Sequence, residues 1–125
     1  MTRRIMIIED NVDNRLLLQA ILGDVYEVTE HPTGPEGLAS LAAERPEIVL
    51  LDISLPGMDG VEVLRHIRAD PEFRHLPVIA FTAHAMSSDR GKYLAHGFDD
   101  YITKPIVDET ILLGSINRLL ERVAA

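Results

Sequence analysis

Five side chains that can take part in chemistry lie at the ends of short apolar runs of the sequence. They are three carboxylates, one hydroxyl and one ammonium: Glu9, Asp10, Asp52, Thr82 and Lys104. Two like charges about 4 Å apart repel by roughly 4 kcal/mol at an effective dielectric constant of about 20. The lysine offsets one of the three negative charges, so the set favours a hard divalent cation such as Mg²⁺, which accepts a few carboxylates and several waters.

The same residue types suit phosphoryl chemistry. A phosphate dianion can approach the carboxylates only together with the cation, the ammonium and the hydroxyl. An aspartate can itself attack phosphorus, and with a pKa near ~3.9 it is ionised at neutral pH and needs no general base. The chain has no cysteine, which excludes disulfides, thiol catalysis and cysteine-ligated zinc.

Five short runs predict strands: Ile5–Ile8, Tyr26–Thr29, Glu47–Asp52, Pro77–Phe81 and Asp100–Thr103. Most of them are apolar without alternation, which is typical of a parallel sheet covered on both faces. The second run is shorter and more polar, so we expect it at an edge of the sheet.

The segments between these runs have helical spacing. The first carries apolar residues at a helical period and is ended by Gly23: Val12, Leu16, Leu17, Ala20 and Ile21. Thr33 resembles a helix cap ahead of the second helix, and Asp108 one ahead of the last. The last helix has a predicted core stripe: Ile111, Leu112, Ile116, Leu119, Leu120 and Val123. A fourth helix within His84–His96 has few large apolar residues and contains Gly91, so we expect it to move most readily.

Five strand–helix units predict an α/β fold with an open, doubly wound parallel sheet. Ligands of such folds bind in the crevice at the carboxyl ends of the strands. The five chemically active side chains named above therefore converge on one crevice.

Four motifs, in order, resemble the receiver domain of bacterial two-component response regulators over essentially the whole chain: IIEDN, LLDISLPGMDG, FTA and DDYITKPI. Each motif alone is weak, and together they are highly specific. The resemblance implies a flavodoxin-like sheet of order 2-1-3-4-5 with five helices.

The resemblance also implies a role for each site residue. Asp52 is the phosphoacceptor, served by Mg²⁺ (Mn²⁺ can substitute). The implied metal ligands are Asp10, Glu9 through water, Asp52 and the backbone carbonyl of Ser54. Lys104 pairs with the phosphoryl oxygens, Thr82 is hydrogen-bonded to the phosphate, and Tyr101 occupies the aromatic switch position. Taken singly, Asp52 and Thr82 are more typical of turn residues than of a site, and Tyr101 is more typical of a core aromatic.

We expect a phosphorylation-dependent switch that receives its phosphoryl group from a histidine kinase. The output would pass through protein contacts of the fourth helix, fifth strand and fifth helix to a partner that the sequence does not name. An alternative is a phosphorelay shuttle or phosphate sink that exchanges with a histidine phosphotransfer protein. A metal-dependent aspartyl phosphohydrolase is a remote alternative, because Ser54 stands where such enzymes carry an acid. The protein would phosphorylate and dephosphorylate itself without being a metabolic enzyme.

The length and the net charge of the chain indicate which binding partners and how many domains to expect. The chain has 125 residues and a net charge of −8, which argues against binding to nucleic acids or anionic membranes. We expect a single domain over residues 1–125 with no output domain. The N-terminus lacks the apolar stretch of a signal peptide, so we expect a cytoplasmic location.

Overall fold

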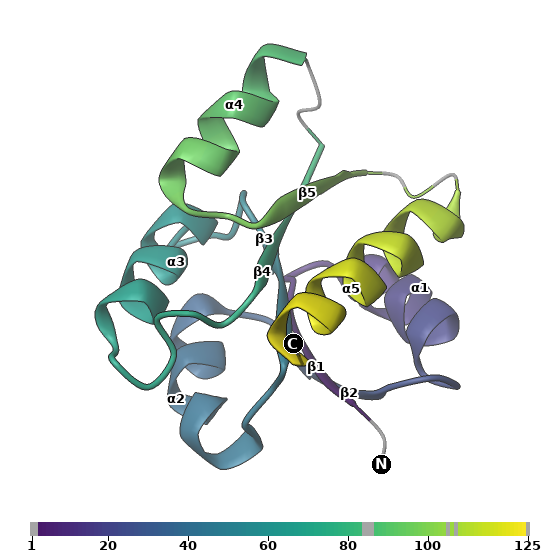
Figure 1. The fold of residues 1–125 in the computed structure, drawn as a ribbon, viewed down its shortest axis with the longest axis horizontal. Coiled ribbons are helices and arrows are strands. Elements are labelled where there is room, and N and C mark those ends of the chain that lie inside the picture. Colours follow the sequence, from purple (N-terminus) through teal and green to yellow (C-terminus); the bar gives the residue numbers. More distant parts are fainter. Residues whose placement is uncertain (1–2, 84–86, 105, 107, 125) are drawn as a thin grey trace.

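The computed structural model describes residues 3–83, 87–104, 106 and 108–124. Strands and helices alternate along the chain (Figure 1). The strands are β1 (Arg4–Ile8), β2 (Glu27–His31), β3 (Ile48–Asp52), β4 (Val78–Thr82) and β5 (Asp100–Thr103). The helices are α1 (Val12–Leu22), α2 (Gly34–Glu44), α3 (Gly60–Ala69), α4 (Ser87–His96) and α5 (Glu109–Ala124). No helix in the described part of the chain is long and apolar enough to cross a membrane.

The strands form one parallel sheet in the order β2-β1-β3-β4-β5. The α/β class, the strand order and the edge position of β2 are confirmed. Because all strands run in the same direction, their carboxyl ends lie along one edge of the sheet, where the active side chains are expected.

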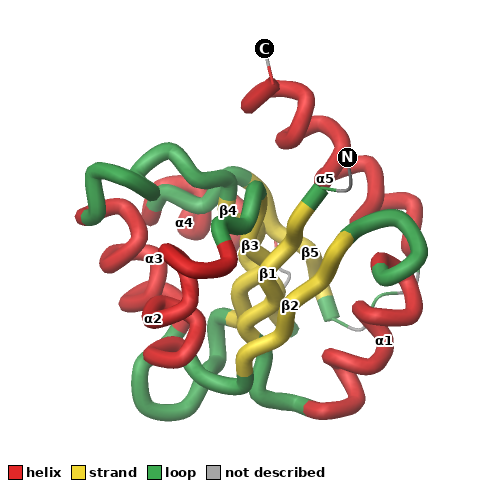
Figure 2. Tube along the Cα trace, turned by 90° about the horizontal axis from the view of Figure 1, so that it is seen from below, coloured by secondary structure: helices red, strands yellow, loops and turns green. Residues whose placement is uncertain are grey.

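Helices cover both faces of the sheet, as Figures 1 and 2 show. On one face, α1 and α5 pack through a core that includes Leu18, Leu22 and Ile116. On the other face, α2, α3 and α4 pack through a core that includes Leu64 and Tyr93. Both faces of the central strands are therefore dry, in agreement with their unbroken apolar sequences.

Short polar side chains begin the helices, since they satisfy free N–H groups of the first turn. The N–H of Glu36 donates to the Thr33 hydroxyl at the start of α2. The N–H of Thr110 donates to the Asp108 carboxylate at the start of α5. Both predicted caps are confirmed.

Several details differ from the predictions, among them the limits of β1, β3 and β4, which lie one residue from those predicted. Strand β2 spans Glu27–His31, because pairing with β1 from Arg4 onward sets its limits and not the apolar character of the run. The apolar period of α1 does not mark its buried face: Leu18 and Leu22 are fully buried, whereas Leu16 is 63% exposed. In α5, Ile111 lies in the first turn and is also 63% exposed, so its place in the core stripe was wrong. Val123 was also predicted for that stripe, but its side chain is not among those that the structure describes.

Gly60 lets the start of α3 pack directly on the end of β3. A Cβ atom at this position would lie 2.5 Å from the carbonyl oxygen of Asp52 and 2.7 Å from Cα of Ile53. Both neighbours are backbone atoms, so they cannot move aside without displacing the residue at the centre of the expected site. The loop between β3 and α3 (residues 53–59, here called the Asp52 loop) therefore requires glycine at position 60 for steric reasons.

We predict opposite effects of alanine at two helical glycines. Gly60→Ala should lower the free energy of unfolding by about 2 kcal/mol or more, because the methyl group meets backbone. Gly114→Ala should raise it by about 0.5–1 kcal/mol, since the added Cβ would have no described atom within 4 Å apart from its chain neighbours and the backbone of its own helix, and alanine favours a helix interior. Urea denaturation measures both, and equal effects would contradict the steric explanation.

Candidate functional site

The carboxyl ends of four strands carry the predicted site residues. Asp52 and Thr82 are the last residues of β3 and β4, and Lys104 follows β5 directly. Glu9 follows β1, which pairs with β3 through Ile8 and Leu51. Adjacent parallel strands therefore bring Glu9 and Asp52 side by side, although 43 positions separate them in the sequence.

Three carboxylates meet at this edge. One oxygen each from Glu9, Asp10 and Asp52 lies within 4.8 Å of the others. Glu9 is fully buried and Asp52 is 2% exposed, whereas Asp10 is open to solvent. Burying two carboxylates this close together is costly unless a cation joins them.

Lys104 supplies a cation. Its Nζ lies 2.7 Å from Oε1 of Glu9 and 3.1 Å from Oδ2 of Asp52. Burial on its own lowers the pKa of Lys104, but hydrogen bonds to Glu9 and Asp52, together with their charges, outweigh it and raise the pKa. The ammonium also lies 4.9 Å from the centre of the Phe81 ring, and the Lys104 N–H donates to the Thr82 carbonyl. The Lys104 ammonium thus balances one of the three negative charges of the carboxylates.

Residues at the start of α1 hold the loop that carries Glu9 and Asp10 in place. The N–H of Asn11 donates to Oε2 of Glu9, and Nδ2 of Asn14 donates to Oε1, both at 3.1 Å. The Arg15 guanidinium donates to the backbone carbonyls of Glu9 and Asp10. Asn14 and Arg15 were missed in the sequence, although their place in the first turn after two acidic residues was a usable signal.

Asp52 is fixed from the other side by its own loop. The N–H of Ser54 donates to Oδ1 of Asp52 at 3.0 Å. The two carboxylate oxygens therefore have different partners, Ser54 on one and Lys104 on the other. A metal contact from the carbonyl of Ser54 stays a prediction.

Thr82 has a partner that was not predicted. Its hydroxyl lies 3.2 Å from the hydroxyl of Tyr93 in α4, and both residues are buried. The Tyr93 ring packs against Tyr101, with ring centres 6.1 Å apart. Tyr101 is half-buried. The predicted switch pair Thr82 and Tyr101 therefore meets on a common neighbour, Tyr93.

The donor set fits a hard divalent cation. Carboxylate oxygens from two buried residues and one exposed residue converge, and oxygen is the ligand atom that Mg²⁺ prefers. The exposed Asp10 leaves one side of the cluster open to solvent. Among the described residues, neither cysteine nor histidine belongs to this cluster, so its chemistry does not favour zinc.

Comparisons with known proteins show which chains this one resembles. A model of the response regulator receiver domain matches residues 5–116. The response regulator PleD of Caulobacter vibrioides is 41% identical over 120 residues, which cover 95% of this chain and 26% of PleD. The polar-differentiation response regulator DivK of Brucella ovis is 39% identical over 107 residues, covering 85% of this chain and 87% of DivK.

A solved structure gives a similar picture. The receiver domain of the sensor histidine kinase PA1611 from Pseudomonas aeruginosa is 33% identical and superposes with a TM-score of 0.87. The match covers 97% of this chain and 99% of that domain, whose structure has a magnesium ion coordinated in the active site cleft. Its fold thus extends over nearly all of the present chain.

The two lysines of the chain should react differently with an amine-acylating reagent in magnesium-free buffer. The raised pKa of Lys104 means that its ion pairs stabilise the fold fully below the pKa of unfolded lysine, about 10.4, and are lost as the pH rises through the higher folded value. A protonated amine does not react with the reagent. Because the raised pKa keeps Lys104 protonated, the exposed Lys92 should react first at about pH 9.5.

Peptide mass spectrometry separates the two sites. Asp52→Asn should speed the labelling of Lys104 and leave that of Lys92 unchanged. If Lys104 were as slow in this variant as in the wild type, burial alone would protect it, and the ion-pair explanation would be wrong.

Proposed function

The chain belongs to the response regulator receiver domain family, and we propose that it is a phosphorylation switch with Asp52 as phosphoacceptor. Receiver domains act in two-component signalling and are not metabolic enzymes. The observation that carries the proposal is Lys104, which bridges Glu9 and Asp52 beside Asp10. This arrangement provides a nucleophile, a cation for phosphoryl oxygens and a cluster of hard metal ligands in one place.

The reaction needs little from the protein beyond position and charge. A carboxylate oxygen of Asp52 forms a bond to phosphorus while the bond from phosphorus to the imidazole nitrogen of a phosphohistidine breaks. The electron pair of that bond stays on the nitrogen, and the ring leaves as neutral imidazole because its other nitrogen carries a proton. The product is an acyl phosphate, and no general base is needed when the carboxylate form of the aspartate is itself the nucleophile.

Magnesium would be held by Asp10, by Asp52 and, through water, by Glu9, with the carbonyl of Ser54 as a further ligand. When bound, it neutralises charge on the phosphoryl oxygens and aligns the attacking and leaving groups. Lys104 then turns from the carboxylates to the phosphoryl oxygens, because these carry the larger negative charge.

The response would spread from Thr82. Its hydroxyl forms a hydrogen bond with the phosphoryl group, and this bond draws the end of β4 toward Asp52. The side chain of Tyr101 then rotates inward behind Thr82. Phosphorylation acts by favouring one of two conformations that the protein already samples. The surface formed by α4, β5 and α5 would present the change to a protein partner, and a histidine kinase would supply the phosphoryl group.

A phosphorelay role is a second candidate. It is favoured by the similarity to the receiver domain of a sensor histidine kinase, which covers almost all of both chains. In such a role the phosphoryl group would pass on from Asp52 to a histidine of a phosphotransfer protein. Return of labelled phosphate from the protein to a partner histidine separates this role from a terminal switch.

Incubation with acetyl phosphate tests the phosphoacceptor. Intact mass spectrometry should show one added phosphoryl group, dependent on Mg²⁺ and removed by base, in the wild type. Asp52→Asn should show none, because it lacks the carboxylate nucleophile.

Asp59→Asn is the matched control. Asp59 is an exposed carboxylate at the N-cap of α3, where its side chain accepts a hydrogen bond from the N–H of Glu62. This variant should be phosphorylated like the wild type. Failure of the wild type with acetyl phosphate and with a phosphorylated histidine kinase, or an adduct that persists in Asp52→Asn, would overturn the assignment.

A further inference from the structure

The hydrogen bond between Thr82 and Tyr93 connects the expected site to α4. The two hydroxyls are 3.2 Å apart, Thr82 is fully buried, and Tyr93 is 6% exposed. A hydrogen bond between two buried hydroxyls is shielded from competition by water, so it holds the Thr82 side chain toward α4. Resting on the proposed function, in which Thr82 turns to a phosphoryl group on β3, this contact acquires a regulatory meaning.

Tyr93 is poorly placed to follow Thr82. Its ring packs edge-on against Phe98 with centres 6.3 Å apart, and its own carbonyl accepts a hydrogen bond from the Phe98 N–H. Phe98 is 3% exposed and belongs to the same core as Tyr93. Moving Tyr93 would therefore disturb a packed core.

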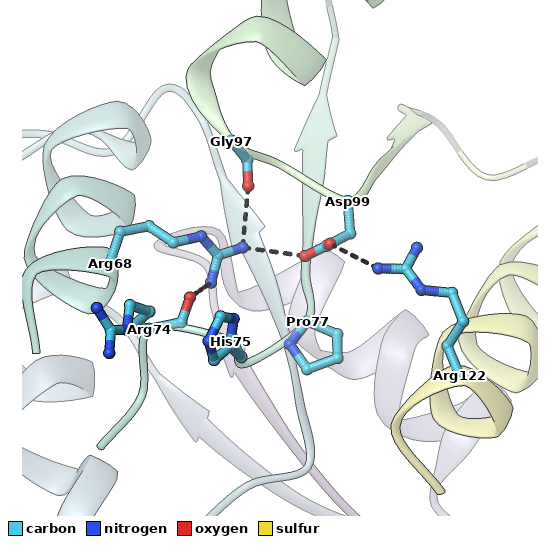
Figure 3. Close-up of a pocket in the computed structure, with 7 residues that line it drawn as sticks. All are labelled: Arg68, Arg74, His75, Pro77, Gly97, Asp99 and Arg122. Carbon is cyan, nitrogen blue, oxygen red and sulfur yellow. Dashed lines mark hydrogen bonds and ion pairs between the residues drawn. The ribbon is translucent and has the colours of Figure 1, made fainter. Parts of the chain in front are cut away.

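The carboxyl end of α4 is also tied to the rest of the protein. Figure 3 shows Arg68 reaching from α3 to the carbonyl of Gly97, at 2.9 Å, and to the carboxylate of Asp99, at 3.0 Å. The same carboxylate accepts a hydrogen bond from the N–H of Val78 in β4. Tyr93 lies one helical turn before Gly97, so it stands on the anchored end of the helix.

We propose that Tyr93 is a positioning residue that holds Thr82 in the resting state and thereby restrains phosphorylation. Because Tyr93 is held by its core and by the anchored end of α4, Thr82 has to leave it in order to reach the phosphoryl group. The resting bond thus stabilises the unphosphorylated conformation and lowers the fraction of molecules that are ready to react. A neutral hydrogen bond shifts such an equilibrium by about three- to tenfold.

Tyr93→Phe removes the hydroxyl and keeps the ring. Phosphorylation by acetyl phosphate at saturating Mg²⁺ should become about three- to tenfold faster in this variant. Tyr26→Phe is the matched control. The hydroxyl of Tyr26 donates to Oδ1 of Asn117 at 2.9 Å, and its ring packs in the core on the side of the sheet covered by α1 and α5. Its phosphorylation rate should equal that of the wild type.

A double-mutant cycle without phosphoryl donor tests the bond itself. Tyr93→Phe and Thr82→Val should have non-additive effects on the free energy of unfolding, whereas Tyr26→Phe and Thr82→Val should be additive. Additive effects in the first pair would overturn the proposed bond.

The kinetic outcome separates the two proposals. A phosphorylated wild type together with an unchanged or slower Tyr93→Phe variant would overturn the restraint and leave Asp52 as the phosphoacceptor. A wild type that accepts no phosphoryl group from any donor would overturn the proposed function, and the restraint would fall with it.

Discussion

Repulsion among carboxylates is the constraint on which the rest of this structure depends. Glu9 and Asp52 are buried next to each other, and Asp10 adds a third negative charge at the surface. Lys104 is the cation that joins the two buried groups. A site that keeps an excess of negative charge and one side open to solvent favours the binding of a further cation.

The fold makes this arrangement stable by surrounding it with dry, well-packed layers. The parallel sheet places strand ends from distant parts of the sequence along one edge, and helices on both faces keep the strands out of water. Hydrogen bonds from the first turn of α1 and from the Asp52 loop then fix the carboxylates individually. The charges are thus oriented before any ligand arrives, which is how a site avoids reorganisation during a reaction.

The sequence predicts this site better than it predicts its surroundings. Apolar runs ending in charged residues identify the strand ends, and parallel topology brings those ends together, so the charged residues could be found without coordinates. The partner of Thr82 could not, because it depends on how α4 packs, and this helix has few large apolar residues to indicate its face. The buried face of α1 was ambiguous for a related reason, since apolar residues occur around most of the helix and Leu16 is exposed.

A crystal structure with Mg²⁺ and beryllium fluoride, which mimics an acyl phosphate on a carboxylate, would test the central claim most directly. The account predicts the adduct on Asp52, the metal between it and Asp10, and the Lys104 ammonium on the fluorine atoms. Thr82 should have left Tyr93 for the adduct. An adduct on another residue, or a Lys104 that still bridges Glu9 and Asp52 with no adduct at saturating concentration, would contradict it.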